Sequence, residues 1–120
     1  MTWTYDQSSG ALSHDGKFIA FGYSGIDAGY NNPAMASSHN TGPIPKGKYT
    51  IGKPFHHPKT GGNTMRLTPS ADTETYGRAG FMIHGDSKAH PGKASHGCII
   101  LLLIYRTQIM NSDDKQLEVK

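Results

Sequence analysis

Residues 81–87 read Phe-Met-Ile-His-Gly-Asp-Ser, and residues 94–99 read Ala-Ser-His-Gly-Cys-Ile. The first stretch is an apolar run that ends on a histidine, which is typical of a buried strand. The second follows a segment without helix or strand pattern and carries the only cysteine of the chain. We therefore expect the strand to place His84 at its end and the loop to bring Cys98 back beside it.

Short strands and turns surround this stretch on both sides. Asp15-Gly16 is a two-residue hairpin signal, because glycine accepts a positive φ without steric cost. The only credible helix covers residues 99–110, and its end is marked by residues 111–112. The expected strands are residues 3–6, 11–14, 17–23, 48–52, 64–67, 80–84 and 116–119. Residues 24–42 and 56–63 are expected loops, and the first is long enough to serve a function.

Composition limits the class of protein. The chain has 120 residues and a mass of 13.0 kDa, which predicts one domain over residues 1–120. Fifteen glycines and seven prolines favour turns and short strands, so the domain is expected to be mostly β with one main helix. The net charge of +3 comes from scattered Lys and Arg, so we expect no nucleic-acid partner. An anionic cell-wall polymer is compatible with this charge.

The location of the protein is predicted from the absence of a secretory signal and of a membrane-spanning run. Residues 1–5 lack the charged start and apolar core of a secretory signal. No run approaches the roughly 20 apolar residues that a membrane span needs. We therefore expect a protein made in the cytoplasm without a signal peptide and without membrane insertion. A single cysteine also excludes an intramolecular disulfide.

A cysteine beside a histidine is the arrangement that thiol catalysis needs. A free thiol has a pKa of about 8.5 and is mostly protonated at neutral pH, so a neighbouring imidazole would favour the reactive thiolate. Gly97 lets the backbone turn tightly before Cys98. The amides of both residues are then candidates for an oxyanion hole, in which one donor contributes roughly 3 to 4 kcal/mol.

These motifs resemble a known family. The Ile-His-Gly at 83–85 followed by Ser-His-Gly-Cys-Ile at 95–99 is similar to the signature of the L,D-transpeptidase (YkuD-like) enzymes of peptidoglycan, and residues 42–51 resemble the family's upstream strand. The whole chain resembles the compact, signal-less branch deployed as type VI secretion effectors. The resemblance implies a small β-sandwich or mixed sheet. It also implies antibacterial activity in the periplasm of target bacteria.

The resemblance also implies a role for each residue of the motif. Cys98 would be the nucleophile and His84 its base, with the backbone carbonyl of Gly85 orienting the imidazole. His96 would shape the site, and Ser95 would brace the turn. The thiol would attack a stem tetrapeptide, release D-Ala and form a thioester. Water, a free D-amino acid or a second stem would then resolve the thioester, and no metal or cofactor would be required.

Two departures from the family pattern concern substrate binding. Ile100 and Leu101 follow the motif where the family usually has Arg or Asn two positions after the cysteine. The segment between the histidine and the second motif is also short. Another cation would then hold the substrate carboxylate. The candidates for substrate contact are Asp86, Ser87 and Arg78, with Lys88 or Lys93 as alternative cations.

Partners and alternatives follow from the same resemblance. The expected partners are tetrapeptide stems, a cognate immunity protein and a secretion apparatus. The alternatives are a housekeeping cross-linking enzyme, a non-catalytic cell-wall-binding module, and a zinc site. The zinc site would use His84, His90, His96 and Cys98, although their spacing matches no familiar zinc motif. A papain-like endopeptidase is disfavoured because it places the cysteine before the histidine.

Overall fold

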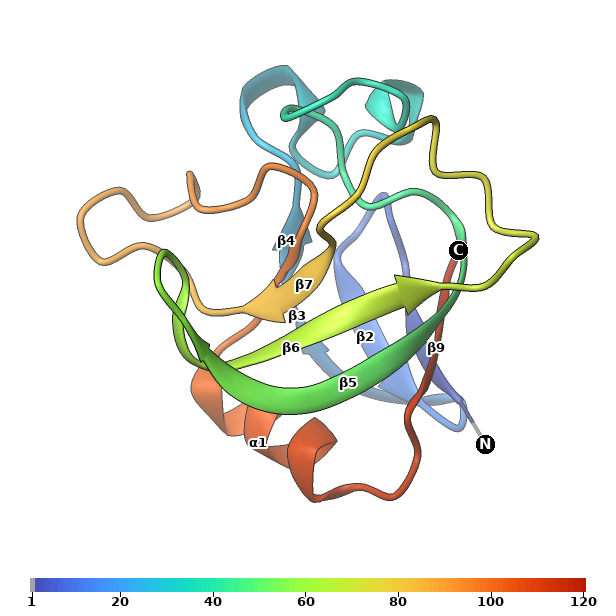
Figure 1. Cartoon of the computed structure of the whole chain (residues 1–120), viewed down its shortest axis with the longest axis vertical. Coiled ribbons are helices and arrows are strands. Elements are labelled where there is room, and N and C mark those ends of the chain that lie inside the picture. The colour runs from blue at the N-terminus through green and yellow to red at the C-terminus, as the bar shows by residue number, and fades with distance from the viewer. Residues whose placement is uncertain (1) are drawn as a thin grey trace.

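The computed structural model describes residues 2–120, in which nine strands and one α-helix follow one another (Figure 1). Two short 3₁₀ turns, Asp27–Gly29 and Pro33–Met35, lie within the long polar loop. The helix α1 spans Leu103–Asn111. The strands are β1 Trp3–Tyr5, β2 Ala11–His14, β3 Lys17–Phe21, β4 Tyr23–Ser24, β5 Gly47–His57, β6 Gly61–Pro69, β7 Met82–His84, β8 Ile99–Ile100 and β9 Gln116–Val119.

All nine strands belong to one mixed sheet in the order β3-β2-β1-β9-β5-β6-β7-β8-β4. The pairs β1–β9 and β7–β8 are parallel, and the other pairs are antiparallel. The two edge strands, β3 and β4, are consecutive in the chain and separated only by Gly22. One continuous segment therefore forms both edges, and the sheet curls until they meet.

Gly22 makes this closure sterically possible. A Cβ atom at this position would lie 2.3 Å from the Ile100 carbonyl oxygen and 2.8 Å from a methyl group of Leu101. The amide of Gly22 also donates a hydrogen bond to the Gly10 carbonyl at 2.8 Å. The backbone at Gly22 thus approaches the backbone at Ile100 more closely than any side chain on residue 22 would permit.

The main core lies inside the curled sheet, against α1. Side chains on a strand alternate between the two faces. On β7, Ile83 is fully buried in this core, whereas Met82 and His84 point to the opposite face. The core residues are Trp3, Tyr5, Leu12, Ile44, Tyr49, Ile51, Met65, Leu67, Phe81, Ile83, Ile99, Leu101, Ile109, Leu117 and Val119.

The predicted architecture is confirmed, and its main error concerns the apolar run after Cys98. Ile99 and Ile100 form β8, parallel to β7, instead of the first turn of a helix. Both are buried, which suits β-branched side chains packed between two neighbouring strands. The helix begins only at Leu103. Residues 102–104, expected to be part of a core helix and its approach, are 66%, 50% and 63% exposed.

The β5–β6 hairpin is the other difference from expectation. Residues 56–63, expected to be a loop, mostly continue the two strands, so that His57 pairs with Gly61 across a short turn. The smaller predictions hold, since Asp15 and Gly16 form the tight turn with φ of 51° and 81°. Strand β9 has the expected bounds. Within residues 2–120, no helix is long and apolar enough to cross a membrane.

Candidate active site

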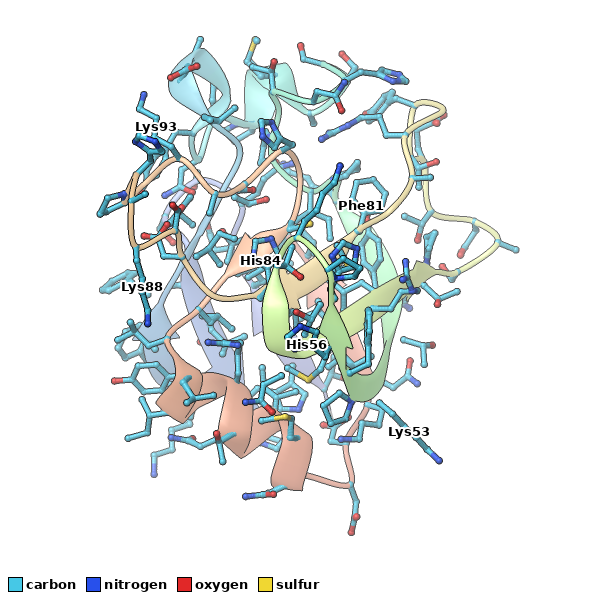
Figure 2. All side chains as sticks on the ribbon, turned by 60° about the vertical axis from the view of Figure 1, so that its left-hand side comes forward. Lys53, His56, Phe81, His84, Lys88 and Lys93 are labelled. Carbon is cyan, nitrogen blue, oxygen red and sulfur yellow. The ribbon has the colours of Figure 1, made fainter. Side chains whose placement is uncertain are left out.

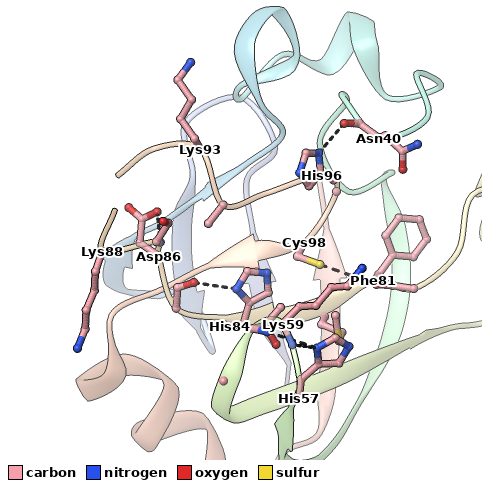
Figure 3. Close-up of a pocket in the computed structure, with 18 of the residues that line it drawn as sticks. Asn40, His57, Lys59, Phe81, His84, Asp86, Lys88, Lys93, His96 and Cys98 are labelled. Atoms are coloured by element: carbon pink, nitrogen blue, oxygen red, sulfur yellow. Dashed lines mark hydrogen bonds between the residues drawn. The ribbon is translucent and has the colours of Figure 1, made fainter. Parts of the chain in front are cut away.

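A pocket of about 810 Å³ opens beside the ends of β7 and β8 (Figure 3). Its walls come from the end of the long polar loop, the β5–β6 turn, the segments flanking β7 and the segment before β8. The residues that line it are 40, 57, 59–61, 79–82, 84–89, 93–94 and 96–98. Segments far apart in the sequence therefore build one cavity around Cys98 and His84.

The parallel pairing of β7 with β8 brings the cysteine and the histidine together. In this register Ile83 lies opposite Ile99, and His84 lies opposite Ile100. Alternation places Met82 and His84 on the pocket face, and Cys98 lies on that same face one residue before β8 begins. Figure 3 shows both side chains within the pocket, which both residues line.

The His84 ring is held in one orientation. Its Nδ1 lies 2.7 Å from the carbonyl oxygen of Gly85, which can only accept a hydrogen bond, so Nδ1 carries the proton. Nε2 is then unprotonated and free to accept a proton. Burial lowers the pKa of His84 below its ordinary value of 6.5, and the positive charge of Arg106 adds to this effect. The ring is therefore a neutral base at physiological pH.

The Cys98 thiol is protonated in the unliganded site. Its sulfur lies 3.8 Å from the Gly80 carbonyl oxygen, toward which the S–H group is directed. Burial raises the pKa of Cys98 to about 11, although the Met82 amide and the charges of Arg78 and Arg66 oppose the shift. Thiol and imidazole are thus both neutral. A protonated thiol becomes a strong nucleophile only when a base removes its proton, and the unprotonated Nε2 of His84 lies in the same pocket.

Ser95 braces the turn that precedes Cys98. Its buried hydroxyl donates to the Cys98 carbonyl at 2.6 Å and accepts from the Gly25 amide at 2.8 Å. The Gly97 amide is also directed at this hydroxyl, at 3.3 Å. That contact corrects the expectation that the Gly97 amide points into the oxyanion hole, because the donor is turned toward Ser95.

His96, Asp86 and Ser87 all line the pocket, where they organise its walls. The Nδ1 of His96 lies 2.9 Å from the Asn40 carbonyl oxygen, which joins the turn to the long polar loop. Asp86 accepts a hydrogen bond from the Tyr23 hydroxyl at 2.6 Å and from the Gly92 amide. The hydroxyl oxygen of Ser87 accepts from the His90 amide. The carboxylate of Asp86 is therefore occupied in holding the 86–92 loop.

Arg78 does not line the pocket, which corrects its expected contact with substrate. Its side chain is buried behind the wall, and the guanidinium donates to four backbone carbonyl oxygens. Lys93 is paired with Asp27 at 2.8 Å. Figure 3 shows Lys88 directed away from Cys98, and in Figure 2 both lysines lie away from His84. None of these three cations is free and directed at the dyad.

Sequence reasoning missed two cations that the fold brings to the site. Lys59, on the β5–β6 turn, reaches across the pocket between His84 and Phe81 (Figure 3). His57 fixes the turn, since its Nδ1 accepts from the Lys59 amide at 3.0 Å. Arg106 lies behind Gly85 and donates to carbonyl groups of the hairpin and of Leu101. Its signal in the sequence was an arginine that follows the apolar run after Cys98.

The alternative zinc set does not converge. Side chains of His84, His96 and Cys98 line the pocket, but their ligand atoms do not form a cluster. Within residues 2–120, the group of three potential ligand atoms within 4.8 Å of one another belongs to His14, Asp15 and Asp114. That group lies on the N-terminal hairpin and the segment before β9, and a hydrogen bond of 2.9 Å between His14 Nε2 and Asp114 accounts for it.

Fold and pocket together define a small curled-sheet domain with a thiol and an imidazole in one pocket. The chain belongs to the Tlde1 domain family, whose sequence profile matches residues 19–119. This is a family of type VI secretion L,D-transpeptidase effectors, so the expected effector branch is confirmed at the level of the family. Membership implies a secretion apparatus and a cognate immunity protein as partners. A search of curated proteins gives no significant match.

Proposed function

We propose that this chain is a cysteine-dependent acyl transferase that trims peptidoglycan stem tetrapeptides and exchanges their terminal D-amino acid. The observation that carries the proposal is that a buried thiol and a neutral, oriented imidazole line the same pocket of about 810 Å³. Membership of an effector family supports a toxin over a housekeeping enzyme. A structural cysteine would not need a histidine held as a base beside it.

The chemistry follows from these protonation states. Nε2 of His84 takes the proton of Cys98 as the sulfur attacks the carbonyl between diaminopimelate and the terminal D-Ala. The C–N bond breaks, the amine of D-Ala leaves with the proton from His84, and an acyl thioester remains on the sulfur. Water then hydrolyses the thioester to a tripeptide. A free D-amino acid instead gives the exchanged tetrapeptide.

The pocket also suggests how the substrate is held. A stem tetrapeptide carries several carboxylates, and the cations at this pocket are lysines on flexible stems. Lys59 is the one whose side chain reaches toward the dyad (Figure 3). We assign it the carboxylate contact that the family usually gives to a residue after the cysteine. Trimming the stems would remove donors for normal cross-linking, which accounts for toxicity in the periplasm of a target cell.

The direct test is mass spectrometry of disaccharide-tetrapeptide incubated with the protein, with and without D-Met. We expect the tripeptide in water and the D-Met tetrapeptide when the amino acid is present. Cys98→Ala and His84→Gln should abolish both products, whereas EDTA should leave them unchanged. Because Cys98 is small and buried, the alanine variant removes the sulfur with little change of shape.

Two results would contradict the proposal. Unchanged tetrapeptide with correctly folded protein would instead favour a non-catalytic cell-wall-binding module. Activity that survives Cys98→Ala but disappears with EDTA would point to a metal-dependent hydrolase. If the main product were a cross-linked dimer, the thioester step would stand. The acceptor would then be a second stem and not water or a small amine.

A further inference from the structure

Arg78 is a buried cation whose partners are all backbone carbonyls. One terminal nitrogen donates to Ala36 at 2.6 Å and to Pro43 at 2.8 Å. The other donates to Gly42 at 2.9 Å and to His96 at 3.3 Å. The guanidinium also lies over the Phe81 ring, 5.5 Å from its centroid. These contacts fix its position between the long polar loop and the turn that carries the nucleophile.

No carboxylate neutralises this charge within residues 2–120. The ion pairs of that range involve His14 and Lys93, and Arg78 is in none of them. Carbonyl dipoles solvate a guanidinium but carry no net charge. Burying a cation without an anion lowers the stability of the fold, so the presence of Arg78 at this place calls for an explanation.

The position of the charge supplies that explanation. A Cβ atom on Gly97 would lie 2.5 Å from a guanidinium nitrogen of Arg78, and Gly97 has a φ of 130°, in the region that favours glycine. Glycine is therefore required here on two grounds, conformation and space. The absence of a side chain lets the guanidinium lie directly against the peptide that precedes Cys98.

We propose that Arg78 is a positioning residue that holds an uncompensated positive charge beneath the Gly97–Cys98 turn and thereby stabilises the thiolate as it forms. The proposal rests on Cys98 being the nucleophile. Arg78 never touches the substrate, because it lies behind the pocket wall. Its four carbonyl contacts keep the charge in place while the thiol changes from neutral to anionic.

Other groups that face Cys98 act alongside Arg78. Arg66 on β6 contributes a more distant positive charge, and the Met82 amide on β7 is directed at the sulfur. His84 and Lys59 face the thiol from the pocket side (Figure 3). Among these groups, Arg78 is the one cation whose whole side chain is buried and held in place. Its removal should therefore have the largest effect on thiol ionisation.

The test measures thiol ionisation without any peptidoglycan, so that its failure is distinct from failure of the proposed reaction. The rate of iodoacetamide alkylation of Cys98 is followed against pH, with thiolate absorbance as a second readout. Because an opposite charge close to a group shifts its pKa by one unit or more, Arg78→Met should slow alkylation about tenfold at any pH below the midpoint. Arg78→Lys should stay within about threefold of the wild type.

A purely structural role needs a matched control. Ser24→Ala removes the hydroxyl that accepts the Ile44 amide at 2.8 Å, so it loosens the same loop without removing a charge. We expect this variant to keep the wild-type alkylation profile. An equal loss of reactivity in Ser24→Ala and Arg78→Met would overturn the proposal, as would an unchanged profile in a folded Arg78→Met variant.

A second measurement needs no change at Arg78, in case the methionine variant fails to fold. The side-chain ¹³Cζ and ¹⁵Nη resonances of Arg78 in the wild-type protein should move with the pH at which Cys98 ionises. They should not move in Cys98→Ser over the same range. Resonances that stay constant through the ionisation of Cys98 would show that the two charges do not interact, which rejects the proposal.

Discussion

At the scale of single residues, the proposed reaction depends on a His84 ring that is kept neutral and a Cys98 thiol that is kept protonated. The pKa of His84 lies below 6.5 because the ring is buried and faces the charge of Arg106. Protonation of Nε2 removes the base, so kcat/KM should fall only as the pH drops below 6.5. The pKa of Cys98, about 11, predicts no loss of activity from the thiol up to about pH 10.

This pH dependence is measured as the rate of D-Ala release between pH 4.5 and pH 10, with the fold checked at each pH by circular dichroism. Arg106→Gln is the informative variant, since it removes the charge that opposes imidazolium formation. It should move the acidic limb to higher pH. An acidic limb at pH 7 or above in the wild type would contradict a His84 pKa held below 6.5.

Lys59 gives the second prediction at this scale. Its side chain is exposed and is directed toward the dyad, so it should contribute about 1 kcal/mol to binding of a carboxylate. Lys59→Met should therefore raise KM roughly five- to tenfold with little change in kcat, and Lys59→Arg should restore most of the affinity. Lys88→Met is the matched control because that side chain is directed away from Cys98. If Lys59→Met and Lys88→Met raised KM equally, the substrate would be attracted by the general positive charge of the pocket and not by a specific contact with Lys59.

At the scale of elements, local pattern predicted the strands that turn residues bound or that show a clear alternation of side chains. The hairpin at Asp15-Gly16 is one example, because its turn chemistry is local. The run after Cys98 was misassigned because six apolar residues fit a buried helix and a buried strand equally well. The pairing of Ile99 and Ile100 with β7 and β4 decides the outcome, and that pairing is not encoded locally.

The same run makes a sharp prediction about stability. Leu101 is 2% exposed and lies in the main core, whereas Leu102 is 66% exposed and Ile104 is 63% exposed. Leu101→Ala should lower the free energy of unfolding by about 2–4 kcal/mol, because it leaves a cavity. Leu102→Ser and Ile104→Gln should each change it by no more than about 0.5 kcal/mol. Urea denaturation of the three variants checks this order, and a large loss in Leu102→Ser would mean that the run packs as a core helix after all.

At the scale of the whole molecule, the site is assembled from segments that the sequence keeps far apart. The sequence motifs predict that residues 84 and 98 lie together, and the structure places both in one pocket. The contribution of Lys59 was not, because it depends on how far the β5–β6 hairpin extends and on where the curled sheet places its tip. The positive charge of Arg78 suggests a contact with substrate. Only the tertiary structure shows that its guanidinium binds backbone carbonyl groups behind the pocket wall.

Closure of the sheet at Gly22 therefore governs the site as well as the fold. A Cβ atom there would meet the Ile100 carbonyl, which belongs to the strand that follows Cys98, so Gly22→Ala should push β4 away from β8. We expect a loss of about 2–3 kcal/mol in unfolding free energy, together with faster amide exchange in β4 and β8. Gly62→Ala is the control, since its Cβ would meet only His56 Nδ1 at an ordinary 3.7 Å. If Gly22→Ala were as stable as Gly62→Ala, the close approach of Gly22 to Ile100 would not be what holds the two edges of the sheet together. The position of Cys98 opposite Met82 would then depend on β7 alone.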